Sequence, residues 1–260
     1  MMPFDDHDYP QVIPTPAYAV AGAPAPWHQL DPSDRQHVSL GRVEQALLAS
    51  ERHFDVALPP EQPAELRDVV ADDEVRPITR RSAVLVALFE ENGEARVLLT
   101  RRSADLKNHR GEVALPGGRS DANESATETA LREASEEIGL SSRAVRVIGW
   151  LSPIVTYASG SAIQPIVGLL QERPTLSANP LEVERIFDVA LSDLMAEGNF
   201  VEQRWRRDVP RPGADADGTF PIYFYRVPGE VVWGATARVL TELLALITGT
   251  QATMPRWVVG

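Results

Sequence analysis

The chain has 260 residues, a net charge of −12 and no cysteine. This length accommodates one catalytic domain with appendages, and the acidic balance excludes nonspecific binding to nucleic acid or to an anionic membrane as a main activity. Without cysteine, the chain has no disulfide, no thiolate nucleophile and no thiolate zinc site.

The N-terminal 35 residues are rich in proline and alanine and show neither helical nor alternating periodicity. We therefore expect residues 1–35 to form a mobile or loosely attached arm. The opening stretch, MMPFDDHDYP, lacks the basic-then-apolar order of a secretory signal, and no apolar run approaches the length of a membrane span. These features predict a cytoplasmic protein that does not bind a membrane.

An amphipathic helix is predicted from Ser39 to Glu51, followed by a proline-rich linker that contains Pro59, Pro60 and Pro63. The helix and linker occupy residues 36–78, the catalytic domain residues 79–250, and a short tail residues 251–260. The apolar side of the helix, which we expect to pack on the domain, consists of Leu40, Val43, Leu47 and Leu48.

The domain opens with two predicted strands, Ser82 to Phe89 and Ala95 to Thr100, joined by a turn at Asn92-Gly93. Four basic residues follow the second strand, either at its end or in the next loop. A local basic cluster of this kind holds a phosphorylated ligand despite the overall negative charge, and the alternative is a set of solvated loop charges. The four residues are Arg101, Arg102, Lys107 and Arg110.

His109 lies in the same polar loop. A histidine there either forms a local hydrogen bond or takes a direct part in catalysis, and the sequence favours the local bond. Pro116-Gly117-Gly118 then predicts a loop whose backbone can approach a ligand closely, because glycine has no Cβ.

A helix is predicted after this loop. Ser125 and Glu128 have the spacing of a capping box, Gly139 has the character of a helix-ending glycine, and Leu140 is the apolar residue that folds back after it.

The same helix carries Glu133, Glu136 and Glu137 at positions i, i+3 and i+4, so the three carboxylates share one face. Like charges at this spacing repel one another, and Glu124 upstream adds a fourth. A hard divalent cation is the counter-charge that fits these oxygen ligands.

Further strands are predicted at Val145 to Trp150 and at Ile163 to Leu170, separated by the loop Ser152 to Ser161. Tyr157 in this loop either packs into the core or stacks on an adenine. Glu182 and Glu184 open the next element, where a glutamate caps the turn or joins the site.

The arginine-rich segment Phe200 to Gly218 is predicted to be an exposed insertion with solvated charges. A hairpin follows from Pro221–Val227 and Glu230–Trp233, and a final helix spans Ala237 to Thr248, with Thr236 as its cap.

Residues 118–140 resemble the Nudix box, Gly-x5-Glu-x7-Arg-Glu-U-x-Glu-Glu-x-Gly-U, where U is a bulky apolar residue. Only Ala134 is smaller than the usual apolar residue. The resemblance implies an α/β fold, an α/β/α sandwich with a mixed β-sheet, and hydrolysis of a nucleoside diphosphate linked to another group. The matching positions are Gly118, Glu124, Arg132, Glu133, Glu136, Glu137, Gly139 and Leu140.

The resemblance also implies roles. Glu133, Glu136, Glu137 and the Gly117 carbonyl resemble the ligands of Mg²⁺ or Mn²⁺, and Arg132 resembles the arginine that orients the glutamates. Glu124 resembles a residue that supports the loop–helix geometry and is not a ligand. The general base is implied to be a glutamate of the box, such as Glu136, or one from a later region, where Glu182 is the candidate.

Residues 98–118 resemble the signature of the coenzyme A pyrophosphatase branch, LLTxR(S/A)x3Rx3Gx3FPGG. Two positions depart from the signature: Lys107 replaces an arginine and Leu115 replaces the phenylalanine. Both departures bear on which substrate the protein binds and not on the branch itself. The branch implies coenzyme A or an acyl derivative as substrate, with Arg102, Ser103, Lys107 and Gly111 as binding residues.

Two alternatives remain open. One keeps the chemistry and changes the substrate to ADP-ribose, NADH or another nucleoside diphosphate derivative. The other is a non-catalytic Nudix module that senses a nucleotide, although such modules commonly lose ligands and none is missing here. The expected partner is a small nucleotide substrate and not nucleic acid. The sequence does not decide whether the chain forms a homodimer.

Overall fold

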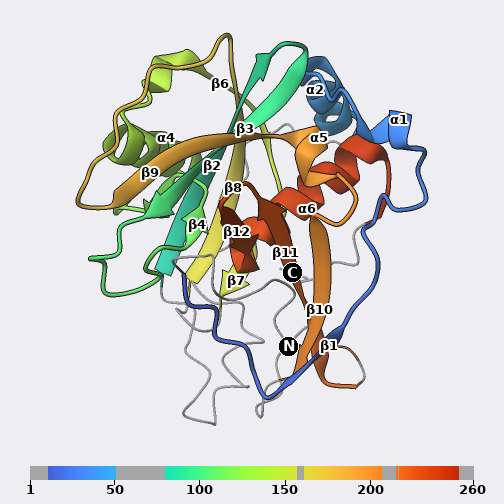
Figure 1. The fold of residues 1–260 in the computed structure, drawn as a ribbon. Coiled ribbons are helices and arrows are strands. Elements are labelled where there is room, and N and C mark those ends of the chain that lie inside the picture. The colour runs from blue at the N-terminus through green and yellow to red at the C-terminus, as the bar shows by residue number, and fades with distance from the viewer. Residues whose placement is uncertain (1–10, 51–79, 157–160, 207–214, 216, 252–260) are drawn as a thin grey trace.

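The computed structural model describes residues 11–50, 80–156, 161–206, 215 and 217–251 (Figure 1). The predicted linker prolines, Tyr157 and most of the predicted C-terminal tail lie outside the described residues. None of the helices in these ranges is both long enough and apolar enough to span a membrane.

A large mixed sheet forms the centre of the molecule, with strand order β4-β3-β2-β8-β6. In addition, β5 pairs with β2, β7 with β8, and β9 with β3. The β2–β8 pair is parallel and the other pairs are antiparallel. The strands are β2 (Arg80–Glu91), β3 (Glu94–Arg102), β4 (Val113–Ala114), β5 (Gly117–Arg119), β6 (Val145–Trp150), β7 (Ile154–Thr156), β8 (Ser161–Leu170) and β9 (Val183–Ala190).

The predicted hairpin at the start of the domain is confirmed. β2 and β3 pair antiparallel across Asn92-Gly93, and both turn residues adopt positive φ angles. The strand at 145–150 is confirmed, and the one expected from Ile163 begins two residues earlier as β8. Gly117 and Gly118, expected in a loop, instead form part of β5 against β2.

A second, four-stranded antiparallel sheet has the order β1-β10-β11-β12. It comprises β1 (Tyr18–Ala21), β10 (Phe200–Arg206), β11 (Thr219–Val227) and β12 (Glu230–Trp233). The hairpin of β11 and β12 was predicted. The sequence did not predict the sheet as a whole.

Two expectations are corrected by this sheet. Residues 200–206 are not an exposed insertion but strand β10, in which Glu202, Gln203 and Trp205 are buried. The described part of the N-terminal arm is not loosely attached, because β1 pairs with β10 and Trp27 is only 1% exposed. The sequence did not predict β10 because its buried positions carry polar residues. It did not predict the packing of the N-terminal segment because the residues that contact Trp27 are distant in the chain.

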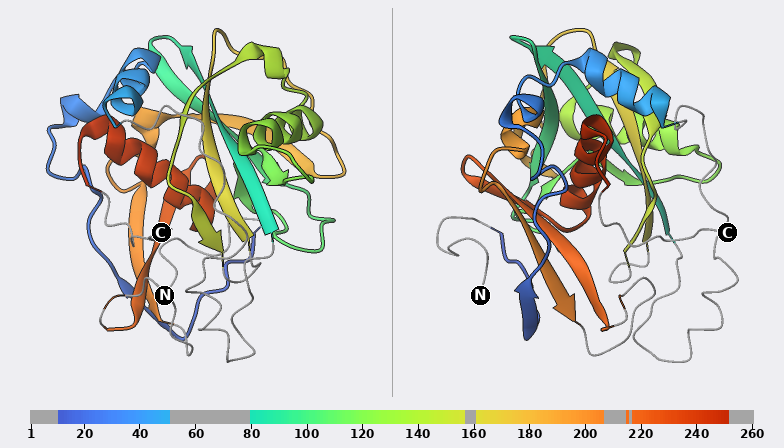
Figure 2. Two further views of the ribbon diagram at one scale, coloured as in Figure 1. Left: turned by 180° about the vertical axis from the view of Figure 1, so that it is seen from behind. Right: turned by 90° about the vertical axis from the view of Figure 1, so that its right-hand side faces the viewer.

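The helices cover both sides of the large sheet (Figures 1 and 2). α4 (Ala126–Ile138) packs on β2 and β8, whereas α6 (Gly234–Thr248) lies on the other side with the second sheet and α2 (Leu40–Ala49). The α/β/α arrangement is confirmed. Two short helices, α1 (Pro32–Arg35) and α5 (Leu191–Leu194), and the 3-10 turn η1 (Ser142–Ala144) complete the set.

Details of two helices differ from the expectation. α6 begins at Gly234, so Thr236 lies inside the helix and does not cap it. In α2, Val43 and Leu47 are buried as predicted, but Leu48 is exposed. The N-cap of α2 is Ser39, whose side chain accepts a hydrogen bond from the Arg42 amide.

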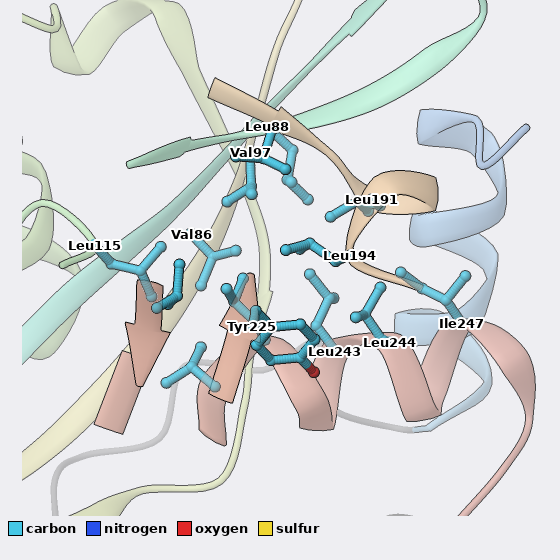
Figure 3. Close-up of a cluster of buried hydrophobic side chains, with 14 of the residues drawn as sticks. Val86, Leu88, Val97, Leu115, Leu191, Leu194, Tyr225, Leu243, Leu244 and Ile247 are labelled. Atoms are coloured by element: carbon cyan, nitrogen blue, oxygen red, sulfur yellow. The ribbon is translucent and has the colours of Figure 1, made fainter. Parts of the chain in front are cut away.

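Two separate apolar layers hold these elements. The first lies between the large sheet and α6 with the second sheet, where Tyr225, Leu243 and Leu194 pack together (Figure 3). The second lies under α4, where Ala130 and Ile138 pack on the opposite face of the large sheet. Burial of one stripe of α4 leaves its other side chains available for chemistry.

Candidate active site

Local signals in the sequence fix both ends of α4. Ser125 Oγ accepts a hydrogen bond from the Glu128 amide at 3.2 Å, and Glu128 Oε2 accepts one from the Ser125 amide at 2.8 Å. Gly139 has a φ of 68° and Leu140, which follows it, is buried. The predicted capping box and glycine ending are confirmed, and they set the register of the glutamates on the helix.

Arg132 joins the acidic residues into one network. Its Nε donates to Glu124 Oε1 at 2.8 Å, and one terminal nitrogen donates to both Glu133 Oε1 and Glu136 Oε2 at 3.0 Å. The other terminal nitrogen donates to Glu124 Oε2 and to the Arg119 carbonyl, both at 3.0 Å. A single guanidinium thus ties the helix to the loop before it.

Glu124 faces inward toward this network. Arg132 is the main cause that lowers the pKa of Glu124 to about 2, with further hydrogen bonds from the Asp121 amide and the Thr129 hydroxyl. Thr129 Oγ1 also lies 2.9 Å from Ser120 Oγ, so the Ser120 hydroxyl can donate to it. Sequence reasoning missed Thr129, which is buried on α4, although its position five residues after Glu124 and four after Ser125 was available as a signal.

Glu137 is the most buried of the three glutamates on the helix face, with 3% of its surface exposed. Its Oε2 accepts a hydrogen bond from the Gly117 amide at 3.0 Å, and its Oε1 lies 3.8 Å from an Arg102 terminal nitrogen. Burial raises the pKa of Glu137 to about 7, against the opposing effects of Gly117 and Arg102. A carboxylate in this state lacks a full counter-charge.

Glu133 and Glu136 occupy different surroundings. Burial also raises the pKa of Glu133, although Arg132 opposes the shift. The Glu136 side chain is 56% exposed and lines a broad open depression of about 710 Å³ on the outer side of α4, together with Arg132 and Ser135. Helical periodicity placed the three carboxylates on one face but did not distinguish their burial.

Glu182 lies near enough to Glu133 and Glu137 that its negative charge helps to raise the pKa of both carboxyl groups. Its carbonyl accepts a hydrogen bond from the Ser103 amide at 2.8 Å, and its own amide donates to the Asn179 carbonyl at 3.0 Å. The structure therefore brings together Glu182 and the end of β3, as the predicted site requires.

Two glycines let β5 run between β2 and α4. A Cβ on Gly118 would lie 2.5 Å from the Glu133 carboxyl carbon, and a Cβ on Gly117 would lie 2.4 Å from the Ala83 carbonyl oxygen. Both distances are shorter than real Cβ atoms tolerate. Glycine is required at position 117, where a Cβ would meet the β2 backbone, whereas a Cβ at position 118 would displace the end of the Glu133 side chain.

The predicted substrate-binding residues divide into two groups. Arg102 and Ser103 lie at the end of β3 beside Glu137 and Glu182, and Ser103 is buried. Gly111 is buried in the following loop with a φ of 64°, whereas Lys107 lies exposed on that loop.

Two neighbours of these residues have local partners. His109 Nδ1 lies 3.0 Å from Glu112 Oε2, and this hydrogen bond raises the histidine pKa, which confirms the expected local bond. Arg101 points away from Arg102 and pairs with Glu184 at 2.9 Å and Glu230 at 2.7 Å.

The donor types fit a magnesium or manganese ion. Carboxylate and carbonyl oxygens are the ligands that these hard cations prefer, and Glu137 offers a buried carboxylate without a full counter-charge. Among the described residues, no three carboxylate or imidazole groups lie close enough together to hold a metal as they stand. Arg132 contacts Glu133 Oε1 and Glu136 Oε2, so the arginine engages one oxygen of each carboxylate and the other oxygen can face a cation.

Three comparisons relate this chain to known proteins. Residues 79–190 match a family model described as NUDIX domain. A protein of Photorhabdus laumondii, named as an uncharacterized Nudix hydrolase, NudL, is 37% identical over 191 residues, which cover 73% of this chain and 91% of the relative. Nudix hydrolase 3 of Caenorhabditis elegans is 34% identical over 175 residues, or 64% and 72% of the two chains. A crystal structure of the M. smegmatis Nudix hydrolase RenU matches 46% of this chain and 78% of its own, with 23% identity and a TM-score of 0.39.

Proposed function

The chain belongs to the Nudix hydrolase family and is a pyrophosphatase of nucleoside diphosphate derivatives, and from this premise we propose that its substrate is coenzyme A or an acyl-coenzyme A. Hydrolysis of the diphosphate releases phosphopantetheine, or its acyl form, and adenosine 3′,5′-bisphosphate. Nudix hydrolases generally use a divalent ion such as Mg²⁺ or Mn²⁺.

The observation that carries the substrate proposal is the place of Arg102. This residue belongs to the coenzyme A-type signature, and its guanidinium lies 3.8 Å from the carboxylate of Glu137. A cation at that point can bind a phosphate next to the acidic site. The departure at Leu115 is compatible with the signature, because Leu115 is buried in the main core and fills a packing position.

We assign the divalent ion to Glu133, Glu136, Glu137 and the Gly117 carbonyl. A cation bound there would lower the pKa of a bound water and neutralise charge on the diphosphate. Arg132 holds Glu133 and Glu136 in place through hydrogen bonds of 3.0 Å to each. Arg102, Ser103, Lys107 and Gly111 line the path of the phosphates at the end of β3 and in the next loop.

Water is the nucleophile in this proposal, and a carboxylate takes its proton as the new P–O bond forms. Glu136 and Glu182 are the two candidates for this general base. Glu136 is more exposed than Glu133 and Glu137, and Glu182 lies near these two from a different element. Either residue places a base near the carboxylates without using the buried Glu137.

Purified protein incubated with Mg²⁺ or Mn²⁺ and coenzyme A tests the proposal. We expect equal amounts of phosphopantetheine and adenosine 3′,5′-bisphosphate, detected by chromatography and mass spectrometry. A panel with ADP-ribose and NADH provides the comparison. Cleavage of either one with no cleavage of coenzyme A rejects the substrate and retains the reaction class, and no cleavage of any compound favours a nucleotide-sensing module.

A further inference from the structure

One arginine near the glutamates has an incomplete set of partners. Arg102 lies 3.8 Å from Glu137, a distance that allows charge attraction but is too long for a hydrogen bond. The Arg102 Nε is buried, and within the described residues it donates no hydrogen bond. Arg132, by contrast, uses all three of its nitrogens in bonds of 2.8–3.0 Å. Arg102 therefore keeps donors for a further ligand.

The backbone of Arg102 is fixed on both sides. Its amide donates to the Glu112 carbonyl at 3.0 Å, and its carbonyl accepts from the Gly111 amide at 3.2 Å. The next residue, Ser103, donates to the Glu182 carbonyl at 2.8 Å. Arg101 and Arg102 are successive residues of β3, so their side chains point to opposite faces of the sheet and meet different neighbours. These backbone hydrogen bonds hold the main chain at Arg102, so a change of partner requires only the side chain to move.

The Arg102 guanidinium has two possible anionic partners, the Glu137 carboxylate, which is always present, and a substrate phosphate, which is present only when substrate binds. Glu137 is a permanent neighbour, and it is also the most buried ligand assigned to the divalent ion. A cation that binds Glu137 cancels the attraction between this carboxylate and Arg102 and adds a repulsion of its own. A substrate phosphate then becomes the nearest anion that can satisfy the free donors of Arg102.

We propose that Arg102 is the counter-ion of Glu137 in the cation-free enzyme and transfers to a substrate phosphate when the divalent ion binds. The inference rests on the function proposed above and deepens it, because it couples the two ligands. Arg102 competes with the cation for Glu137 in the absence of substrate and no longer competes once a phosphate holds it. By linkage, cation and diphosphate each increase the affinity for the other.

Mn²⁺ titrations followed by calorimetry and by electron paramagnetic resonance test the competition without a catalytic assay. We expect Arg102→Ala to bind Mn²⁺ about fivefold or more tightly than the unchanged protein. Arg102→Lys, which keeps the charge, should remain near the unchanged protein. Arg110→Ala is the matched control, because it removes the same charge from the loop that follows β3, where the Arg110 Nε donates to the Leu106 carbonyl at 2.7 Å. Its Mn²⁺ affinity should change less than about twofold.

The coupling is measured with α,β-methylene-ADP, a diphosphate that resists hydrolysis. Mn²⁺ should increase the affinity of the unchanged protein for this probe more than it does for Arg102→Ala. Should Arg102→Ala fail to fold, Arg102→Met is a neutral variant of similar length. Equal Mn²⁺ affinities for Arg102→Ala and Arg110→Ala would overturn the inference alone. Failure of the unchanged protein to bind Mn²⁺ would overturn both the inference and the proposed function, so the two failures are distinguishable.

Discussion

Burial raises the pKa of two glutamates beside arginines, Glu230 and Glu137, but the two carboxylates differ in how closely the arginines approach them. Glu230 Oε1 is 2.7 Å from Arg101 and 3.3 Å from Arg185, so two cations from β3 and β9 hold a carboxylate of β12. Glu137 has one arginine at 3.8 Å and one backbone amide at 3.0 Å. The protein neutralises Glu230 with its own side chains and leaves Glu137 short of positive charge.

This difference separates a structural ion pair from a ligand site. The Glu230 cluster joins the second sheet to the large sheet, and its charges pair with one another, although Glu230 Oε2 and Arg101 Nε have no hydrogen-bond partner among the described residues. At Glu137, burial raises the pKa to about 7, which means that the carboxylate is costly to keep charged without an added cation. A buried acid with too little counter-charge is where an external ion contributes most.

The comparison is tested most strongly at Glu137 itself. Glu137→Gln keeps the shape and removes the charge, so we expect kcat with Mg²⁺ to fall about 10³-fold, equivalent to ~4 kcal/mol of lost transition-state stabilisation. The free energy of unfolding of the cation-free protein should not fall, because an amide is easier to bury than this carboxylate. Steady-state kinetics and urea unfolding measure the two effects. A variant with full turnover would remove Glu137 from the site.

The second test breaks the structural pair. Glu230→Ala leaves Arg101 and Arg185 without their shared anion, and we expect a loss of about 3 kcal/mol in the free energy of unfolding in urea. Glu184→Ala is the matched control, because Glu184 pairs with the same Arg101 but its side chain is 44% exposed. The control should cost less than about 1 kcal/mol. Equal losses in the two variants would contradict the assignment of Glu230 as the structural member.

The acid–base behaviour of Glu137 provides a third test. Its pKa is about 7 in the folded protein and near 4.5 in the unfolded chain. Between these values the unfolded chain binds fewer protons, so the free energy of unfolding falls as pH rises from 4.5 to 7. We expect Glu137 to contribute a loss of about 2 kcal/mol between pH 5 and pH 7.5 in the absence of divalent ions.

Urea unfolding across this pH range, in a chelating buffer, measures the loss. Glu137→Gln should flatten the part of the profile that Glu137 contributes, and saturating Mn²⁺ should reduce it, because a bound cation favours the charged carboxylate. A profile that is identical in the unchanged protein and in Glu137→Gln would show that burial does not raise this pKa.

The sequence predicts those parts of the structure that depend on contacts between residues close together in the chain, and misses those that depend on distant residues. α4 was predicted in detail, because the bonds between Ser125 and Glu128 and the ending at Gly139 involve residues a few positions apart. The shared face of the three glutamates follows from helical geometry alone. Their unequal burial does not, because it depends on β5 passing next to Glu137.

The second sheet illustrates what a local reading misses. Trp27 is buried because its ring packs with Phe200 and Tyr225, which lie more than 170 positions away in the chain. Strand β10 looks polar, yet Glu202 is buried beside Arg204 on the same strand. A charge pair on the same face of a strand allows polar residues to occupy positions that a hydrophobic pattern assigns to solvent.

The smallest expected effect comes from a change at the N-terminal cap of α4, the helix that carries Glu137, and not from a change in the charge of Glu137. Ser125→Ala removes the side-chain acceptor for the Glu128 amide at the start of α4 and should lower the free energy of unfolding by about 1 kcal/mol. Because Arg132 still ties the helix to Glu124 and to the Arg119 carbonyl, Mn²⁺ affinity should stay within about twofold of the unchanged protein. A large loss of Mn²⁺ affinity in this variant would mean that the cap, and not the arginine network, positions the glutamates.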